Sequence, residues 1–92
     1  MDAGKFLEFC RQVVADYFNT EVDVTDETQI TTDDVFVLWL CKTSQNIKAL
    51  LSTTVPDGMY YELTYNGDKD ELYLDAYKKW ENILIKDVSK RI

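Results

Sequence analysis

The sequence predicts one α+β domain in which an N-terminal helix and a C-terminal helix cover one face of a three-stranded antiparallel sheet. The chain has 92 residues and no long Pro-, Gly- or Ser-rich stretch, so residues 1–92 are expected to form a single domain. Apolar residues make up 46% of the chain, which is enough for a packed core. Their spacing changes from three and four residues near the N-terminus to two residues in the middle, as expected when strands follow a helix.

The first helix is predicted from about Asp2 to Phe18. Its apolar residues recur at intervals of three and four, which places them on one side of a helix; they are Phe6, Phe9, Cys10, Val13, Val14, Tyr17 and Phe18. Asn19 is the expected end of the helix, because it tolerates the left-handed conformation. The segment 20–34 is rich in Thr and Asp and has no periodicity, so we expect an extended connection outside the core.

Three strands are predicted between residues 35 and 65. Val35–Thr43 is dense in β-forming residues and apolar on both faces, which is typical of a central strand. A turn signal follows, and Ile47–Thr54 is the second strand of the hairpin. After the break at Pro56, the alternating segment Met59–Tyr65 is the third strand.

The last segment allows two interpretations. The favoured one is a tight turn at Asn66-Gly67 and then one helix from about Asp70 to Asp87, with acids near its start and bases near its end. Five apolar residues share a face of this helix, and Trp80 among them is expected to pack on the sheet; they are Leu72, Ala76, Trp80, Ile83 and Leu84. The competing interpretation is a fourth strand, Glu71–Ala76, followed by a helix from Asp75.

No catalytic motif is present, and we predict that the protein is not an enzyme. The chain has no histidine, which removes the commonest general base and a common metal ligand. Cys10 and Cys41 lie in apolar runs and are expected to be reduced core thiols. The acidic segments do not have the spacing of a calcium loop, and the three glycines are too far apart for a phosphate-binding loop. We therefore predict no catalytic residue, no cofactor and no metal.

Acidic residues are concentrated in the first third of the chain. Residues 1–35 contain nine acids and two bases, a net charge of −7 that equals the charge of the whole protein. The segment is either a solvated connection that keeps the protein in solution or a surface that binds a basic protein partner. The candidate partner-binding residues are Asp23, Asp26, Glu27, Asp33 and Asp34. Inhibition of another protein, for example by imitating DNA, is a narrower form of the second interpretation.

Two other classes of function were compared with this interpretation. The order helix, three strands, helix also occurs in double-stranded RNA-binding domains, and the predicted C-terminal helix carries several bases, but a net charge of −7 disfavours nucleic-acid binding. The six tyrosines and the open sheet edges suit a self-associating structural protein, with a homodimer as its simplest form.

Four runs of residues stand out, namely Lys48–Thr54, Asp57–Tyr61, Tyr65–Asp68 and Asp75–Trp80. With these runs the sequence resembles a family of short uncharacterised proteins encoded by phages and prophages of Gram-positive bacteria. The likeness extends to the N-terminal helix and hence over most of the chain, and none of the runs is a catalytic signature. The resemblance implies a small accessory protein that binds host or phage machinery in a bacterial cell. No targeting segment is visible, and the longest apolar run has seven residues against the ~20 that cross a membrane, so we expect a cytoplasmic protein.

Overall fold

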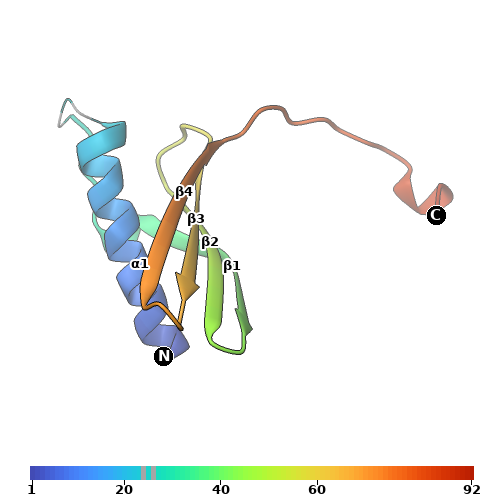
Figure 1. Cartoon of the computed structure of the whole chain (residues 1–92). Helices are drawn as coiled ribbons and strands as arrows, with labels where there is room; N and C mark the ends of the chain where they lie inside the picture. Colours follow the sequence, from blue (N-terminus) through green and yellow to red (C-terminus); the bar gives the residue numbers. More distant parts are fainter. Residues whose placement is uncertain (24, 26) are drawn as a thin grey trace.

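A computed structural model, described for residues 1–23, 25 and 27–92, has one long helix packed on one face of a four-stranded antiparallel sheet (Figure 1). The elements are α1 (Ala3–Tyr17), the π turn η1 (Phe18–Val22), the 3-10 turn η2 (Thr32–Asp34), β1 (Val35–Thr43), β2 (Asn46–Thr53), β3 (Met59–Asn66), β4 (Glu71–Lys78) and the 3-10 turn η3 (Val88–Lys90). The strands lie side by side in the order β1-β2-β3-β4, so each is paired with its neighbour in sequence.

The first helix is confirmed. Asp2 caps its N-terminus, with the side chain accepting a hydrogen bond from the backbone N–H of Lys5 at 3.1 Å. The helix ends at Tyr17, within one residue of the predicted end, but the predicted left-handed conformation at Asn19 is wrong, because the chain continues into η1. Asn19 instead holds the following connection: its amide donates to the carbonyl of Ile30 and accepts from the N–H of Ile30, both at 2.9 Å.

The core lies between α1 and the middle two strands. One side of the helix is buried through residues at three- and four-residue intervals, and alternate residues of β2 and β3 face it; the central ones are Phe6, Cys10, Val14 and Phe18 from the helix and Ile47, Ala49, Leu51, Tyr61 and Leu63 from the strands. This match of a helical period to a strand period explains why the sequence forms these elements.

The predicted three-stranded sheet and C-terminal helix are wrong. Residues 71–78 form a fourth strand, in which Leu72 pairs with Tyr65 and Leu74 pairs with Leu63. The two-residue period of this segment therefore prevails over its helical period, because pairing with β3 places Leu72 and Leu74 against the core. The competing interpretation was right about the strand but wrong about a helix from Asp75. In the part of the chain that the structure describes, no α-helix follows β4.

β1 has the predicted bounds, but its predicted central position is wrong. It is an edge strand that pairs only with β2, and the register shifts between Val37 and Trp39, as in a β-bulge. Bulges are frequent at sheet edges, where they disturb pairing with further strands. Some of the apolar residues of β1, such as Val35, are therefore buried in the core, whereas others, such as Phe36 and Trp39, are exposed at the surface.

The turn between β3 and β4 is longer than predicted. Asn66 accepts hydrogen bonds from the backbone of Asp68 and Lys69, and the positive φ lies at Asp70 (53°). Gly67 is needed for space, because a Cβ at this position would overlap the backbone oxygen of Gln45 in the β1–β2 turn. The two turns therefore pack directly on each other at one end of the sheet.

The chain after β4 leaves the folded body, and we call residues 79–92 the tail (Figure 1). Trp80, predicted to pack on the sheet, is 96% exposed. The radius of gyration is 15.6 Å, against about 12 Å for a compact chain of this length, as expected for an extended tail. Among the described helices, none is long and apolar enough to cross a membrane.

Candidate interaction surfaces

Two of the five predicted partner-binding carboxylates hold their own connection together. Asp23 accepts hydrogen bonds from the side chain and backbone of Thr25 and from the backbone of Thr28. The hydrogen bond from the Thr25 side chain, with the others, lowers the pKa of Asp23 below its ordinary value. Asp34 closes a capping box with Thr31, whose N–H donates to the carboxylate at 2.9 Å.

Of the other three acids of the predicted site, the two that the structure describes have no such role. Glu27 and Asp33 are exposed, and Asp26 lies outside the described residues. The predicted site is therefore a connection in which some acids shape the backbone while others face solvent.

The sheet face opposite α1 is not covered by any described element, and we call it the open face. Tyr61 and Leu63 point toward α1, so their neighbours Tyr60, Glu62 and Thr64 point to the open face. Register then assigns exposed aromatic rings from both edge strands to this face; they are Phe36 and Trp39 on β1 and Tyr73 and Tyr77 on β4. Trp39 is 41% exposed and Tyr73 is 56% exposed, so the rings offer substantial contact area.

The open face also carries acids. Glu71 and Asp75 of β4 alternate with Tyr73 and Tyr77, and Glu62 of β3 lies beside them in the register. The hydroxyl of Tyr73 donates to Glu71 at 3.1 Å, and this hydrogen bond raises the pKa of Tyr73. Within the described residues, the single ion pair joins Glu62 to Lys48 at 3.3 Å. The face therefore combines aromatic rings with excess negative charge.

Sequence reasoning missed this face because it assigned Tyr73 and Tyr77 to a helix. The signal that could have found it is the alternation of acids and tyrosines in Glu71–Tyr77. That pattern places the acidic and aromatic side chains on one face of a strand and Leu72, Leu74 and Ala76 on the other.

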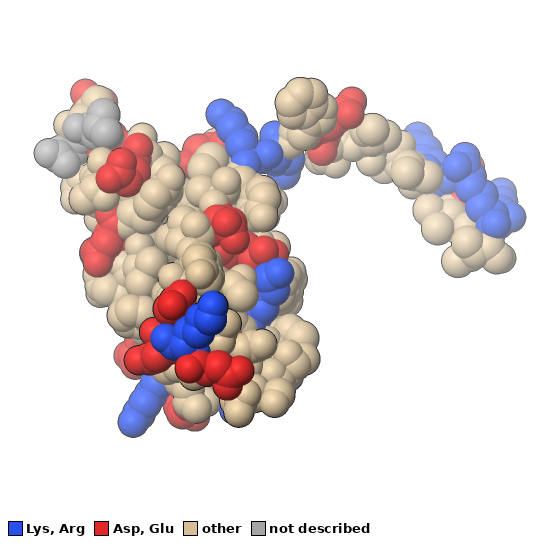
Figure 2. Space-filling model, viewed as in Figure 1, with Lys and Arg blue, Asp and Glu red and all other residues tan. Residues whose placement is uncertain are grey.

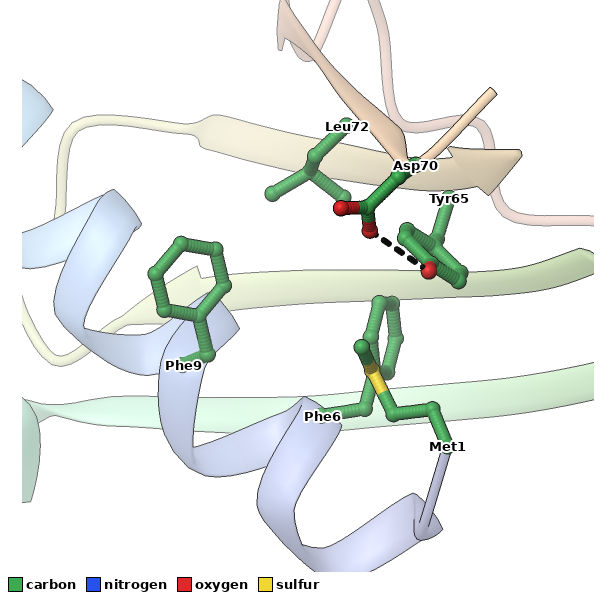
Figure 3. A pocket seen from close by; sticks show the side chains of 6 residues that line it. All are labelled: Met1, Phe6, Phe9, Tyr65, Asp70 and Leu72. Carbon is green, nitrogen blue, oxygen red and sulfur yellow. Dashed lines mark hydrogen bonds between the residues drawn. The ribbon is translucent and has the colours of Figure 1, made fainter. Parts of the chain in front are cut away.

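A cavity of about 420 Å³ opens between the start of α1 and the β3–β4 turn (Figure 3). Its lining is mostly apolar and consists of Met1, Phe6, Phe9, Tyr65, Asp70 and Leu72. The hydroxyl of Tyr65 donates to the Asp70 carboxylate at 2.8 Å, which raises the pKa of Tyr65. The two polar groups of the cavity are therefore bonded to each other, and the remaining lining suits an apolar side chain rather than an acid–base reaction.

The two cysteines lie in different environments. Cys10 is buried, as predicted, and burial raises the pKa of its thiol to about 12. The prediction for Cys41 is wrong, because this residue is exposed on the open face of the edge strand β1. Neither forms a disulfide, and the described residues contain no group of three or more His, Cys, Asp or Glu side chains that could hold a metal ion.

Comparison with known protein families gives a match over most of the chain. Residues 7–87 match a family of unknown function (DUF6275). No curated protein and no solved structure is similar enough to add a function or a fold to this match. Because the match spans most of the 92 residues, from α1 through β4 and into the tail, the chain belongs to this family of unknown function, DUF6275.

Proposed function

We propose that the protein is a noncatalytic protein-interaction module that binds a protein with a basic surface. The observation that carries this proposal is the charge of the folded body. Residues 1–78 contain fifteen acids and six bases, a net charge of −9. In the view of Figure 2, acidic side chains are spread over the visible surface of the body. Such a field attracts basic partners and repels other acidic proteins.

The open face supports the same proposal. Aromatic residues, and Tyr and Trp above all, are enriched in the buried centres of protein interfaces. Trp39, Tyr73 and Tyr77 are exposed on a face that also carries Glu71 and Asp75. An aromatic centre with acids around it suits a partner surface in which apolar residues are surrounded by Lys and Arg.

The biological setting of the proposal is that of a small accessory protein of phage type in the cytoplasm of a bacterial host. It is supported by the resemblance of four runs of the sequence to phage and prophage proteins of Gram-positive bacteria. Inhibition of a nucleic-acid-binding enzyme by imitation of DNA is a narrower form of the proposal. Competition between DNA and the protein for a captured partner tests that form.

Quantitative capture from a Gram-positive host lysate tests the proposal, with two charge-neutralised variants. One changes the exposed acids of the connection (Glu21→Gln, Glu27→Gln, Asp33→Asn) and leaves Asp23 and Asp34 to hold the backbone. The other changes the open face (Glu71→Gln, Asp75→Asn). Capture of a basic protein by the unchanged chain, weakened by salt and by one of the variants, is the expected result.

The matched control is Asp68→Asn, which removes one exposed acid in the β3–β4 turn, away from both surfaces. Its recovery of the partner is expected to equal that of the unchanged chain. If both neutralised variants also recover the partner undiminished at every salt concentration, binding does not use the acidic surfaces and the proposal is wrong.

A further inference from the structure

We propose that the open face binds the tail of a second copy of this chain, so that two chains exchange their tails reciprocally. The inference rests on the proposed function, because it names an occupant for the sheet face assigned there to interaction. Three features of the chain support it: a tail whose exposed apolar residues follow its last backbone hydrogen bond to the body, opposite charges on tail and body, and the direction in which the tail leaves β4.

The tail is apolar and detached. Its last backbone hydrogen bond to the body is from Lys79 N–H to the carbonyl of Gly58 at 2.8 Å, and the later backbone bonds join only tail residues to each other. Large apolar side chains are exposed beyond that point; they are Trp80, Ile83, Leu84, Ile85, Val88 and Ile92. So many exposed apolar groups in fourteen residues are typical of a segment that binds a surface.

Tail and body have opposite charge. The tail contains four bases and two acids, a net charge of +2, whereas residues 1–78 carry −9. In Figure 2 the Lys and Arg side chains gather where the tail begins and near its end. On the open face, Glu71 and Asp75 are exposed beside Tyr73 and Tyr77. The face thus offers aromatic rings for the apolar tail residues and acids for Lys86 and Lys90.

The exit of the tail favours a second copy over the chain's own sheet. The backbone bond of Lys79 to Gly58 fixes the first residue, and the Lys79 ammonium lies 5.8 Å from the centre of the Tyr60 ring. No Gly or Pro follows to reverse the chain, and the tail's single residue with positive φ in the described backbone is Asp87 (55°). The tail accordingly runs outward, away from α1 (Figure 1).

The tail is long enough for this exchange. Fourteen extended residues span about 46 Å, whereas an eight-residue strand spans about 26 Å, so one tail can cross the whole face of another copy. A two-fold axis makes both contacts equivalent, with each open face covered once. Exchange of this kind covers both tails and both open faces in the dimer, and leaves the exposed acids of the connection for a basic partner.

Charge reversal tests the exchange in the full chain. One variant reverses the face (Glu71→Lys, Asp75→Lys) and the other reverses the tail (Lys86→Glu, Lys90→Glu), and light scattering measures the mass against 10.7 kDa for one chain. The unchanged chain is expected to have twice this mass. Each variant alone is expected to lose the dimer, and an equal mixture is expected to regain it, because both contacts then join opposite charges again. Circular dichroism checks that each variant is folded.

Cys41 gives a second test, because it is an exposed thiol on the open face and Cys10 is buried. Single cysteines introduced along the tail (Glu81→Cys, Leu84→Cys, Val88→Cys) can join Cys41 by a disulfide under mild oxidation where the Cα atoms lie about 4.4–6.8 Å apart. At least one variant is expected to form a covalent dimer on a non-reducing gel. A disulfide within a monomer would show that the tail returns to its own sheet and would overturn the exchange.

The two proposals can fail separately. A monomer at every concentration without covalent dimers, or a dimer that both charge-reversed variants retain, overturns the tail exchange. Capture of a basic protein by such a monomer would leave the interaction module standing. Conversely, a charge-dependent dimer that captures no basic protein would leave the exchange standing and contradict the proposed function.

Discussion

Cys10 is completely buried in the centre of α1, where its thiol packs in the core between the helix and the sheet. Burial disfavours the thiolate and raises the pKa from 9.0 to about 12. Burial likewise raises the pKa of Tyr61 from 10.0 to about 12, and the charge of Asp57 acts in the same direction. Because both pKa values are higher in the folded protein than in the unfolded chain, both groups make folding stability depend on alkaline pH.

The first prediction concerns this dependence. The stability linked to Cys10 is fully present below pH 9.0 and is lost as the pH rises toward about 12, since the unfolded chain releases the proton first. Cys10→Ala should remove the contribution of the thiol to this pH dependence. The free energy of unfolding of the variant should then begin to fall only near pH 10.0, where the contribution of Tyr61 begins to be lost. Urea unfolding from neutral to alkaline pH measures both onsets. An identical onset in both proteins would contradict the assignment to Cys10.

A second prediction concerns the Tyr61 hydroxyl. The side chain is fully buried, and among the described residues no partner hydrogen-bonds its hydroxyl. Tyr61→Phe should therefore leave the free energy of unfolding unchanged or raise it, because a buried polar group without a partner costs about 1–3 kcal/mol. Tyr61→Ala should lower it by about 3–5 kcal/mol, as for other large aromatic residues in cores. Destabilisation by Tyr61→Phe in urea unfolding would show that the hydroxyl has a partner.

The side-chain hydrogen bonds of Asn19 connect η1 to the chain before β1. Its side chain makes two hydrogen bonds with the backbone of Ile30, whose own side chain is buried. Asn19→Ala removes both bonds and is expected to cost about 1–3 kcal/mol. Thr20→Ala is the control, because its hydroxyl bonds only within the helical turn, to Asp16 and Tyr17. Equal stability of the two variants would mean that the connection is not held by Asn19.

The β1–β2 and β3–β4 turns pack on each other through Gly67. Gly67→Ala should cost about 1–3 kcal/mol, because the new Cβ overlaps the backbone oxygen of Gln45 and lies 2.9 Å from its Cβ. Gly4→Ala is the matched control: its Cβ meets only the Asp2 carboxylate at 3.3 Å, and alanine favours a helix by about 1 kcal/mol. In thermal unfolding, Gly67→Ala should lower the Tm of the protein and Gly4→Ala should raise it.

At the level of elements, periodicity predicted α1, β1, β2 and β3 to within one or two residues at each end. It failed after Asn66 because Leu72 and Ala76 satisfy a helical period and a strand period at once. The choice depends on β3, whose residues Tyr65 and Leu63 accept Leu72 and Leu74 as neighbours. A single sequence also does not reveal strand order, so the edge position of β1 could not be predicted from its composition.

At the level of the surface, the sequence shows where the acidic residues lie along the chain. It does not show which of them hydrogen-bond to the backbone and which face solvent. Local hydrogen bonds to Asp23 and Asp34 become visible only when the turns are known. The open face could not be predicted because its rings come from strands that are far apart in sequence. Trp39 and Tyr73 share a face only after three strand pairings have been made.

For the molecule as a whole, the separation of charge is a consequence of the fold. The body carries −9 and the tail carries +2, and beyond Lys79 the tail makes no backbone hydrogen bond to the described body. Basic residues that would form one face of a helix are instead distributed along an extended segment. Among the described residues, the tail therefore forms no α-helix with a basic face that could lie along a duplex.

The last prediction follows from that distribution. Phosphate groups are bound by clustered bases, and each additional contact strengthens binding at low salt. Here the tail carries only four bases, and the body to which it is attached carries a net charge of −9 that repels the phosphates of a nucleic acid. Gel-shift titrations with duplex RNA and DNA at low salt should therefore give no saturable complex. A variant with Lys78, Lys79, Lys86 and Lys90 changed to Gln should behave identically. Saturable binding that this variant abolishes would instead place the protein among nucleic-acid-binding domains that use a basic tail.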